Sequence, residues 1–105
     1  MIAIAPFTME QIKSCADAIR AKLPVVKIIL FGSSARGDTT QDSDADLLVV
    51  LKDNHGLKRP RYEATLAVAK ARTGVPTDIL VITEKASRSP HSPIIEDALK
   101  EGILV

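Results

Sequence analysis

Hydrophobic residues fall into blocks separated by short polar segments, and the spacing within each block predicts its secondary structure. Thr8 and Gln11 have the spacing of a helix capping box, and Pro24 ends the first block. The apolar residues between them recur at helical intervals, which predicts an amphipathic helix: Ile12, Cys15, Ala16, Ile19 and Leu23.

Three later blocks are short and rich in β-branched or aliphatic residues, which is typical of buried strands. They are residues 25–31 (VVKIILF), 46–51 (DLLVVL) and 77–83 (TDILVIT). Between the second and third, Pro60 suits the first turn of a helix that runs toward Gly74. A strand, helix, strand order at this point predicts a layered α/β arrangement.

The C-terminal quarter predicts a loop, a helix and a last short strand. Residues 85–93 (KASRSPHSP) have the composition of a loop, Ser92 and Pro93 suit a helix start, and Gly102 suits its end. Residues 103–105 (ILV) then form the last strand. The whole order predicts an α/β (α+β) sandwich, with a small mixed sheet of about four strands covered by helices, in one domain over residues 1–105.

A glycine turn follows the first predicted strand directly. Gly32 lets a ligand approach the backbone, and Ser33 or Ser34 can cap a short helix whose N–H groups suit a phosphate. Neither the Walker pattern nor the Gly-x-Gly-x-x-Gly dinucleotide pattern is present. Taken alone, these residues are better explained by an ordinary strand-to-helix turn with a serine cap.

Acidic residues stand at the start of two predicted strands. Asp44 and Asp46 are two residues apart, so their side chains project from the same face of the second strand. Asp78 opens the third strand and joins them if the two strands are neighbours. Crowded carboxylates raise one another's pKa unless a cation lies between them, and Mg²⁺ prefers such ligands. The alternative is a solvated strand entrance with turn-forming acids.

The order of these motifs resembles the DNA polymerase beta-like nucleotidyltransferase superfamily, and within it the minimal nucleotidyltransferase domains. The resemblance lies in residues 30–33 (LFGS), 35–37 (ARG) and 43–47 (SDADL), about a quarter of the chain. The resemblance extends loosely over the chain and implies a complete domain with the polymerase beta-like fold.

The resemblance also implies roles for the site residues. Gly32 and Ser33 would contact the triphosphate of a nucleotide such as ATP, and Asp44 and Asp46 would bind two Mg²⁺ ions. Asp78 would be the third carboxylate of the catalytic and metal-binding set.

Three further features leave alternatives open. Arg36 can steady a phosphate or can pair with Asp38 or Asp42. Ser34 departs from the larger, often basic residue of many relatives, which puts the substrate preference in doubt. The basic residues within 58–61 can meet a nucleotide or a partner, or can form a solvated loop.

The hydrophobic content, charge balance and cysteine count indicate which classes of protein this chain can belong to. The 105 residues are 46% hydrophobic, enough for one core, and 14 basic residues balance 13 acidic ones. The chain therefore lacks the broad basic field that would indicate general nucleic-acid binding. We also expect no sequence-specific binding of nucleic acid. The single cysteine, Cys15, excludes an internal disulfide, and no segment reads as a membrane span or signal peptide, so we expect a cytoplasmic protein.

The resemblance implies a function for the site. Similar minimal domains are antitoxins encoded beside helical HEPN proteins and transfer AMP to them, so we expect Mg²⁺-dependent transfer from ATP to a protein hydroxyl. The alternatives are a non-catalytic module that neutralises a partner by contact, and an oligomeric subunit that modifies a small molecule such as an antibiotic. Residues 58–61 and 87–93 are the predicted docking loops, expected at the same end of the sheet as the acids.

Overall fold

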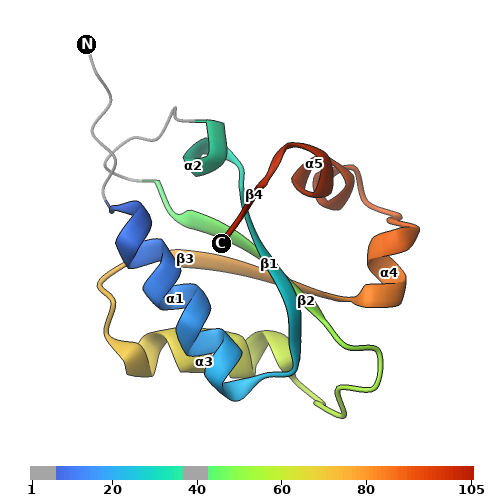
Figure 1. The fold of residues 1–105 in the computed structure, drawn as a ribbon, viewed down its shortest axis with the longest axis horizontal. Helices are drawn as coiled ribbons and strands as arrows, with labels where there is room; N and C mark the ends of the chain where they lie inside the picture. The colour runs from blue at the N-terminus through green and yellow to red at the C-terminus, as the bar shows by residue number, and fades with distance from the viewer. Residues whose placement is uncertain (1–6, 37–42) are drawn as a thin grey trace.

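The fold is a four-stranded sheet with helices on both faces, as the sequence predicted (Figure 1). A computed structural model of the protein describes residues 7–36 and 43–105. No helix in these two ranges has the length and apolar character needed to cross a bilayer. The elements in chain order are α1 (Met9–Lys22), β1 (Val25–Phe31), α2 (Ser33–Arg36), β2 (Ala45–Leu51), α3 (Pro60–Ala71), β3 (Thr77–Thr83), α4 (Glu84–Arg88), α5 (Pro93–Glu101) and β4 (Ile103–Leu104).

The sheet is mixed, with the strand order β3-β2-β1-β4. β1 pairs antiparallel with both β2 and β4, whereas β2 and β3 run parallel. The parallel pair is connected by α3, the expected crossover between parallel strands. This topology places the end of β1 and the starts of β2 and β3 at the same end of the sheet.

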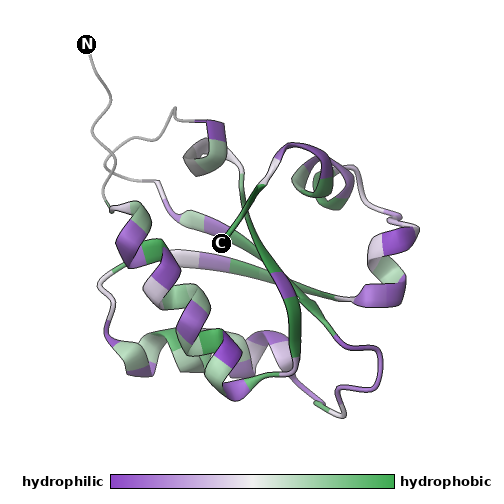
Figure 2. Ribbon diagram, viewed as in Figure 1, coloured by the Kyte–Doolittle hydropathy of each residue, from purple (hydrophilic) through white to green (hydrophobic). Residues whose placement is uncertain are grey.

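Two hydrophobic clusters lie on opposite faces of the sheet. On one face, α1 and α3 pack over residues such as Leu30 and Leu47. On the other face, α5 packs through Ala98 over Leu48 and Val50. All but one of the β2 residues are buried, because β2 is central and covered on both sides. Figure 2 shows mostly green along the inner strands, with a purple band within β1, and more purple on the helices and loops.

The N-terminal helix begins as its capping box predicts. The Thr8 hydroxyl accepts a hydrogen bond from the Gln11 N–H at 3.1 Å, and the Gln11 side chain accepts one from the Thr8 N–H at 2.8 Å. Cys15 is fully buried on the apolar face of α1, where burial raises the pKa of its thiol. The predicted packing role of Cys15 is therefore confirmed.

One predicted element is wrong. Residues 85–93 do not form a continuous loop, because α4 occupies Glu84–Arg88. The Thr83 hydroxyl accepts a hydrogen bond from the Ala86 N–H at 3.2 Å and caps this short helix. The serines and prolines that predicted a loop lie mostly after α4, so the loop itself is shorter.

Candidate functional site

Asp46 is the centre of the candidate site. It lies near the start of β2, aligned with Phe31 of β1 and with Asp78 of β3. Partial burial raises the pKa of its carboxyl, and the negative charges of Asp78 and then Asp44 raise it further. Asp78 and Asp44 are therefore both close enough for their charges to act on the Asp46 carboxyl.

Asp44 and Asp78 flank Asp46 in more exposed positions. In β2 and β3, Asp46 and Asp78 alternate in phase with Leu48 and Leu80, so their side chains start from the face of the sheet that α5 covers. Asp44 lies just before β2. The expectation that the third strand lies beside the second is confirmed by the β2–β3 pairing. The roles of the three acids in metal binding and catalysis remain predictions.

Gly32 brings backbone directly against the Asp46 carboxylate. Its φ of +71° is in the left-handed region, where side chains are disfavoured. A Cβ atom on Gly32 would collide with Oδ2 of Asp46, so only glycine allows this approach. The Gly32 carbonyl accepts a hydrogen bond from the Arg36 N–H at 3.2 Å, and α2 begins at Ser33. Ser33 is therefore the first helical residue and not the cap.

Arg36 adds a positive charge near the acids. Its guanidinium lowers the pKa of Asp46, opposing the larger effects of burial and of the two neighbouring acids. The alternative partners considered for it, Asp38 and Asp42, lie outside the described residues. A cation at this position can also contact a phosphate bound over Gly32.

Arg61 was not predicted to contact the acids. Its guanidinium lies 3.2 Å from a carboxylate oxygen of Asp78, in an ion pair whose side chains are 65% and 54% exposed. The sequence signal was the basic cluster within 58–61, but the two partners are 17 residues apart. Only the packing of α3 against β3 brings them together.

The acids fit a hard divalent cation by their chemistry. Asp44, Asp46 and Asp78 supply carboxylate oxygens, which a hard cation prefers, and a cation would offset the charge on Asp46 that burial and the neighbouring acids disfavour. Within residues 7–36 and 43–105, no three acidic, histidine or cysteine side chains converge on one point. Asp78 points instead to Arg61, and its exposure leaves it room to turn.

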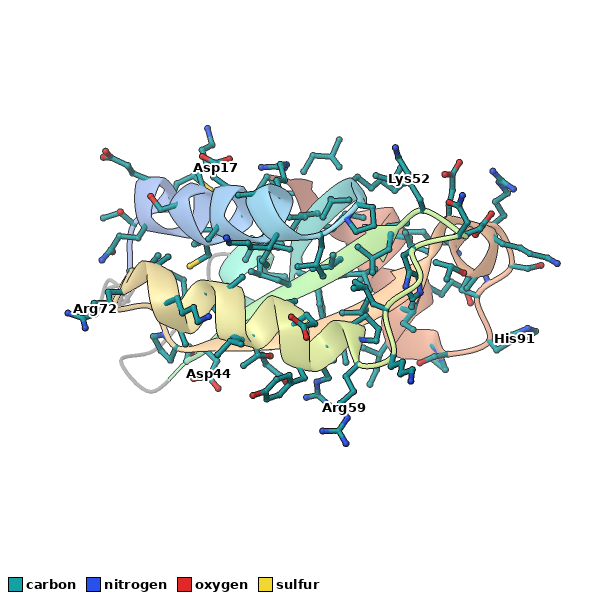
Figure 3. All side chains as sticks on the ribbon, turned by 90° about the horizontal axis from the view of Figure 1, so that it is seen from below. Asp17, Asp44, Lys52, Arg59, Arg72 and His91 are labelled. Atoms are coloured by element: carbon teal, nitrogen blue, oxygen red, sulfur yellow. The ribbon has the colours of Figure 1, made fainter. Side chains whose placement is uncertain are left out.

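One of the two predicted docking segments, residues 87–93, lies away from the acids. The acids stand at the starts of the parallel strands β2 and β3, whereas residues 87–93 follow the end of β3. Residues 58–61 come after the end of β2, but Arg61 reaches Asp78. Figure 3 shows Asp44 at one end of the molecule and Lys52 and His91 at the other. Among the basic residues of 58–61, Arg61 alone reaches an acid of the site through a described ion pair.

The raised pKa of Asp46 predicts a pH-dependent cost to stability. In the folded protein this carboxyl binds its proton more tightly than in the unfolded chain, so stability falls as pH rises from the ordinary pKa through the raised one. The Asp46→Asn variant should therefore unfold at a higher temperature than the wild type at pH 7 without metal. Below the ordinary aspartate pKa the difference should vanish, and a lower midpoint at pH 7 would contradict the account. Calorimetry at both pH values measures it.

The Arg61 ion pair predicts competition with a cation for Asp78. The Arg61→Ala variant should bind Mn²⁺, a spectroscopic substitute for Mg²⁺, more tightly by up to about fivefold, the range of an exposed ion pair of ~1 kcal/mol. Arg59→Ala is the matched control, because Arg59 forms no ion pair with a described residue. Weaker Mn²⁺ binding in Arg61→Ala would show that Arg61 instead holds Asp78 in its binding position.

Known proteins are similar to this chain in sequence and in fold. The model of the nucleotidyltransferase domain family matches residues 12–105. Two proteins of Methanocaldococcus jannaschii, each named "Putative protein adenylyltransferase", are 30% identical to the chain. The alignments span 95 and 93 residues and cover 90% and 89% of both chains. A solved structure described as a "putative minimal nucleotidyltransferase" is 27% identical, has a TM-score of 0.61, and is matched over 91% of this chain and 89% of its own.

Proposed function

The chain belongs to the nucleotidyltransferase domain family, and on that premise we propose that it transfers AMP from ATP to a hydroxyl group of a protein partner. The observation that supports this most is the alignment of Asp46 with Asp78 beside the bare backbone of Gly32. A phosphate over Gly32 and a cation at the carboxylates would then be neighbours. Those are the two requirements for displacement at phosphorus.

At the α-phosphorus, the proposed reaction forms one bond and breaks one. The acceptor oxygen bonds to the α-phosphorus of ATP, the bond from that phosphorus to the bridging oxygen of the β-phosphate breaks, and pyrophosphate leaves. The hydroxyl proton passes to a base, and the exposed carboxylate of Asp78 is the candidate. Gly32 and Ser33 bind the phosphates through the backbone and a hydroxyl, and Arg36 balances their charge.

Asp44 and Asp46 are the residues that would hold two Mg²⁺ ions, with Asp78 as the third carboxylate. When bound, the ions neutralise charge on the phosphates and lower the pKa of the acceptor hydroxyl. The Asp46 carboxylate, held by β2 and partly buried, would fix the position of both. Asp44 and Asp78 are more exposed and can adjust to them.

A protein acceptor is supported by the names of the two archaeal relatives and by the position of the site. Asp44 and Asp78 are exposed, so an acceptor on the surface of a large molecule can reach them. We propose a helical HEPN-like protein as that partner, in the arrangement of a toxin and its antitoxin.

The test mixes the chain with the product of an adjacent gene, ATP and Mg²⁺, and measures intact masses. We expect the partner to gain one AMP, and Asp46→Asn to bind the partner without modifying it. Modification of a free small molecule and not of the partner would favour an antibiotic-type enzyme. Binding that neutralises the partner without any mass change would favour the non-catalytic module.

A further inference from the structure

The strand β3 forms one edge of the sheet, and within residues 7–36 and 43–105 no strand pairs with its outer side. The outer side of an edge strand presents backbone N–H and C=O groups that can bind another chain. Proteins usually protect such an edge with lysine, proline, a bulge or a short strand. The seven residues of β3 (TDILVIT) include no lysine or proline, and their register with β2 is continuous. β3 is therefore open to an added strand.

One side of α3 runs beside the start of this edge. Arg61 reaches β3 through its ion pair with Asp78. Thr65 and Arg72 follow Arg61 by four and then seven residues, which places the three on the same side of the helix. Thr65 and Arg72 also line a cavity of about 350 Å³ that extends to Thr77, the first residue of β3. We call these three residues the α3 flank.

The α3 flank is positively charged, because two of its three residues are arginines. Arg72 forms no ion pair with a described residue, and its φ of +52° is a left-handed position that glycine usually takes at the end of a helix. No acidic residue in the described part of the chain lines the cavity beside it. Glu63 lies on the other side of α3, where it lines a groove facing α1. A segment beside the start of β3 would therefore meet two guanidinium groups and the single carboxylate of Asp78.

Pairing along β3 determines what lies opposite Asp78. Directly opposite residues of an antiparallel pair point to the same face of the sheet, with Cβ atoms roughly 4.5–5.5 Å apart. A residue opposite Asp78 would therefore hold its side chain beside the carboxylate that is the candidate base. An acidic residue elsewhere in the added strand could pair with Arg61, which would leave Asp78 free to contact a hydroxyl.

A second copy of this chain is the other occupant that an open edge can take. Two copies of β3 paired antiparallel are related by a twofold axis perpendicular to the sheet, so both α3 helices lie on the same face. The two α3 flanks then approach each other, and their like charges disfavour the pair. An acidic segment meets no such repulsion.

We propose that the outer edge of β3 binds the acceptor segment of the protein partner as an added antiparallel strand. The acceptor residue lies opposite Asp78, and acidic residues of the segment face Arg61 and Arg72. The inference rests on the proposed function and states how its acceptor is held. Backbone hydrogen bonds along β3 give affinity for an extended segment, and the two arginines select an acidic one. Of the predicted docking segments, this surface keeps Arg61 and replaces residues 87–93 with β3.

The test measures peptide binding without ATP, so it can fail independently of the proposed transfer. The isotopically labelled chain is titrated to about 2 mM with the peptide Ser-Val-Thr-Val-Tyr-Val-Asp-Glu, and amide hydrogen exchange is recorded by NMR. We expect slower exchange at alternate residues of Thr77–Thr83, since every second N–H of β3 points outward. The same peptide ending in Lys-Lys should bind at least about tenfold more weakly.

Two N-methylated peptides test whether binding uses the backbone. Each carries methyl groups on every second amide nitrogen, in one of the two possible phases, and neither changes a side chain. Only one phase removes the N–H groups that face β3, so we expect one peptide to lose binding and the other to keep it. Equal binding of both would overturn the proposal.

Matched charge reversals on the two sides of α3 locate the surface. Arg72→Glu should weaken the acidic peptide by about tenfold, whereas Lys70→Glu, on the side of α3 that faces α1, should change its affinity by less than about twofold. The proposal is overturned if β3 gains no protection from the acidic peptide, or if both variants weaken it equally. It is also overturned if the chain alone forms a dimer with alternate β3 amides protected, because a second copy then occupies the edge.

Discussion

Replacing Asp46 with asparagine is expected to abolish magnesium-dependent transfer while leaving the fold intact. Asp46 is the one acid of the site that is both partly buried and flanked by the other two, so its loss removes the centre of the ligand set. Even outer-shell partners of a metal cost 10–100-fold when removed, so we expect a loss of more than about 100-fold. Asp44→Asn should act in the same direction.

The fold should tolerate Asp46→Asn because asparagine has the same shape and removes a charge that its surroundings disfavour. Asp17→Asn is the control, since Asp17 is an exposed acid on α1 that pairs with Arg20 away from the site. The measurements are initial rates of AMP transfer and the affinity for Mn²⁺ by calorimetry. Unchanged metal and nucleotide affinity in Asp46→Asn would refute the assignment of the site.

Adding a single methyl group at Gly32 is the second change with a large expected effect. Gly32→Ala places a Cβ against the Asp46 carboxylate and also strains a backbone with φ of +71°. We expect ATP and metal binding to fall together, because the collision displaces the acid while the methyl group obstructs the phosphates. The backbone strain alone costs about 1–2 kcal/mol of stability.

Gly56 provides a matched control for the strain. Its φ of +72° is nearly the same, but no atom beyond its chain neighbours lies within 4 Å of the position that a Cβ would occupy. Gly56→Ala should therefore lower the free energy of unfolding by a similar amount and leave ATP binding unchanged. Equal loss of ATP affinity in both variants would mean that Gly32 serves only as a structural turn.

Local patterns predicted most of the fold because the chemistry that defines each element lies within it. The capping pair of Thr8 and Gln11 fixes the start of α1, and the β-branched runs fix three strands within one residue of their observed bounds. The helix α4 was missed because its only cap, Thr83, is also the last residue of β3. A residue that ends one element and begins another gives no separate signal.

The relative positions of the site residues depended on strand direction. Because β2 and β3 are parallel and their register pairs Asp46 with Asp78, the two acids are neighbours, and the segments that follow the two strands begin at the other end. The sequence predicted the first consequence but not the second. The contact of Arg61 with Asp78 and the open edge of β3 come from tertiary packing, which no local pattern records.

The central claim is that the acids at the starts of β2 and β3 hold a divalent cation beside the phosphates of a nucleotide. Paramagnetic broadening of amide signals by Mn²⁺, with and without ATP, tests it most directly. The account predicts selective broadening at Gly32, Asp46 and Asp78, enhanced by ATP and lost in Asp46→Asn, with residues 52–59 unaffected. Broadening centred on residues 52–59, or broadening at Asp46 that persists in Asp46→Asn, would contradict it.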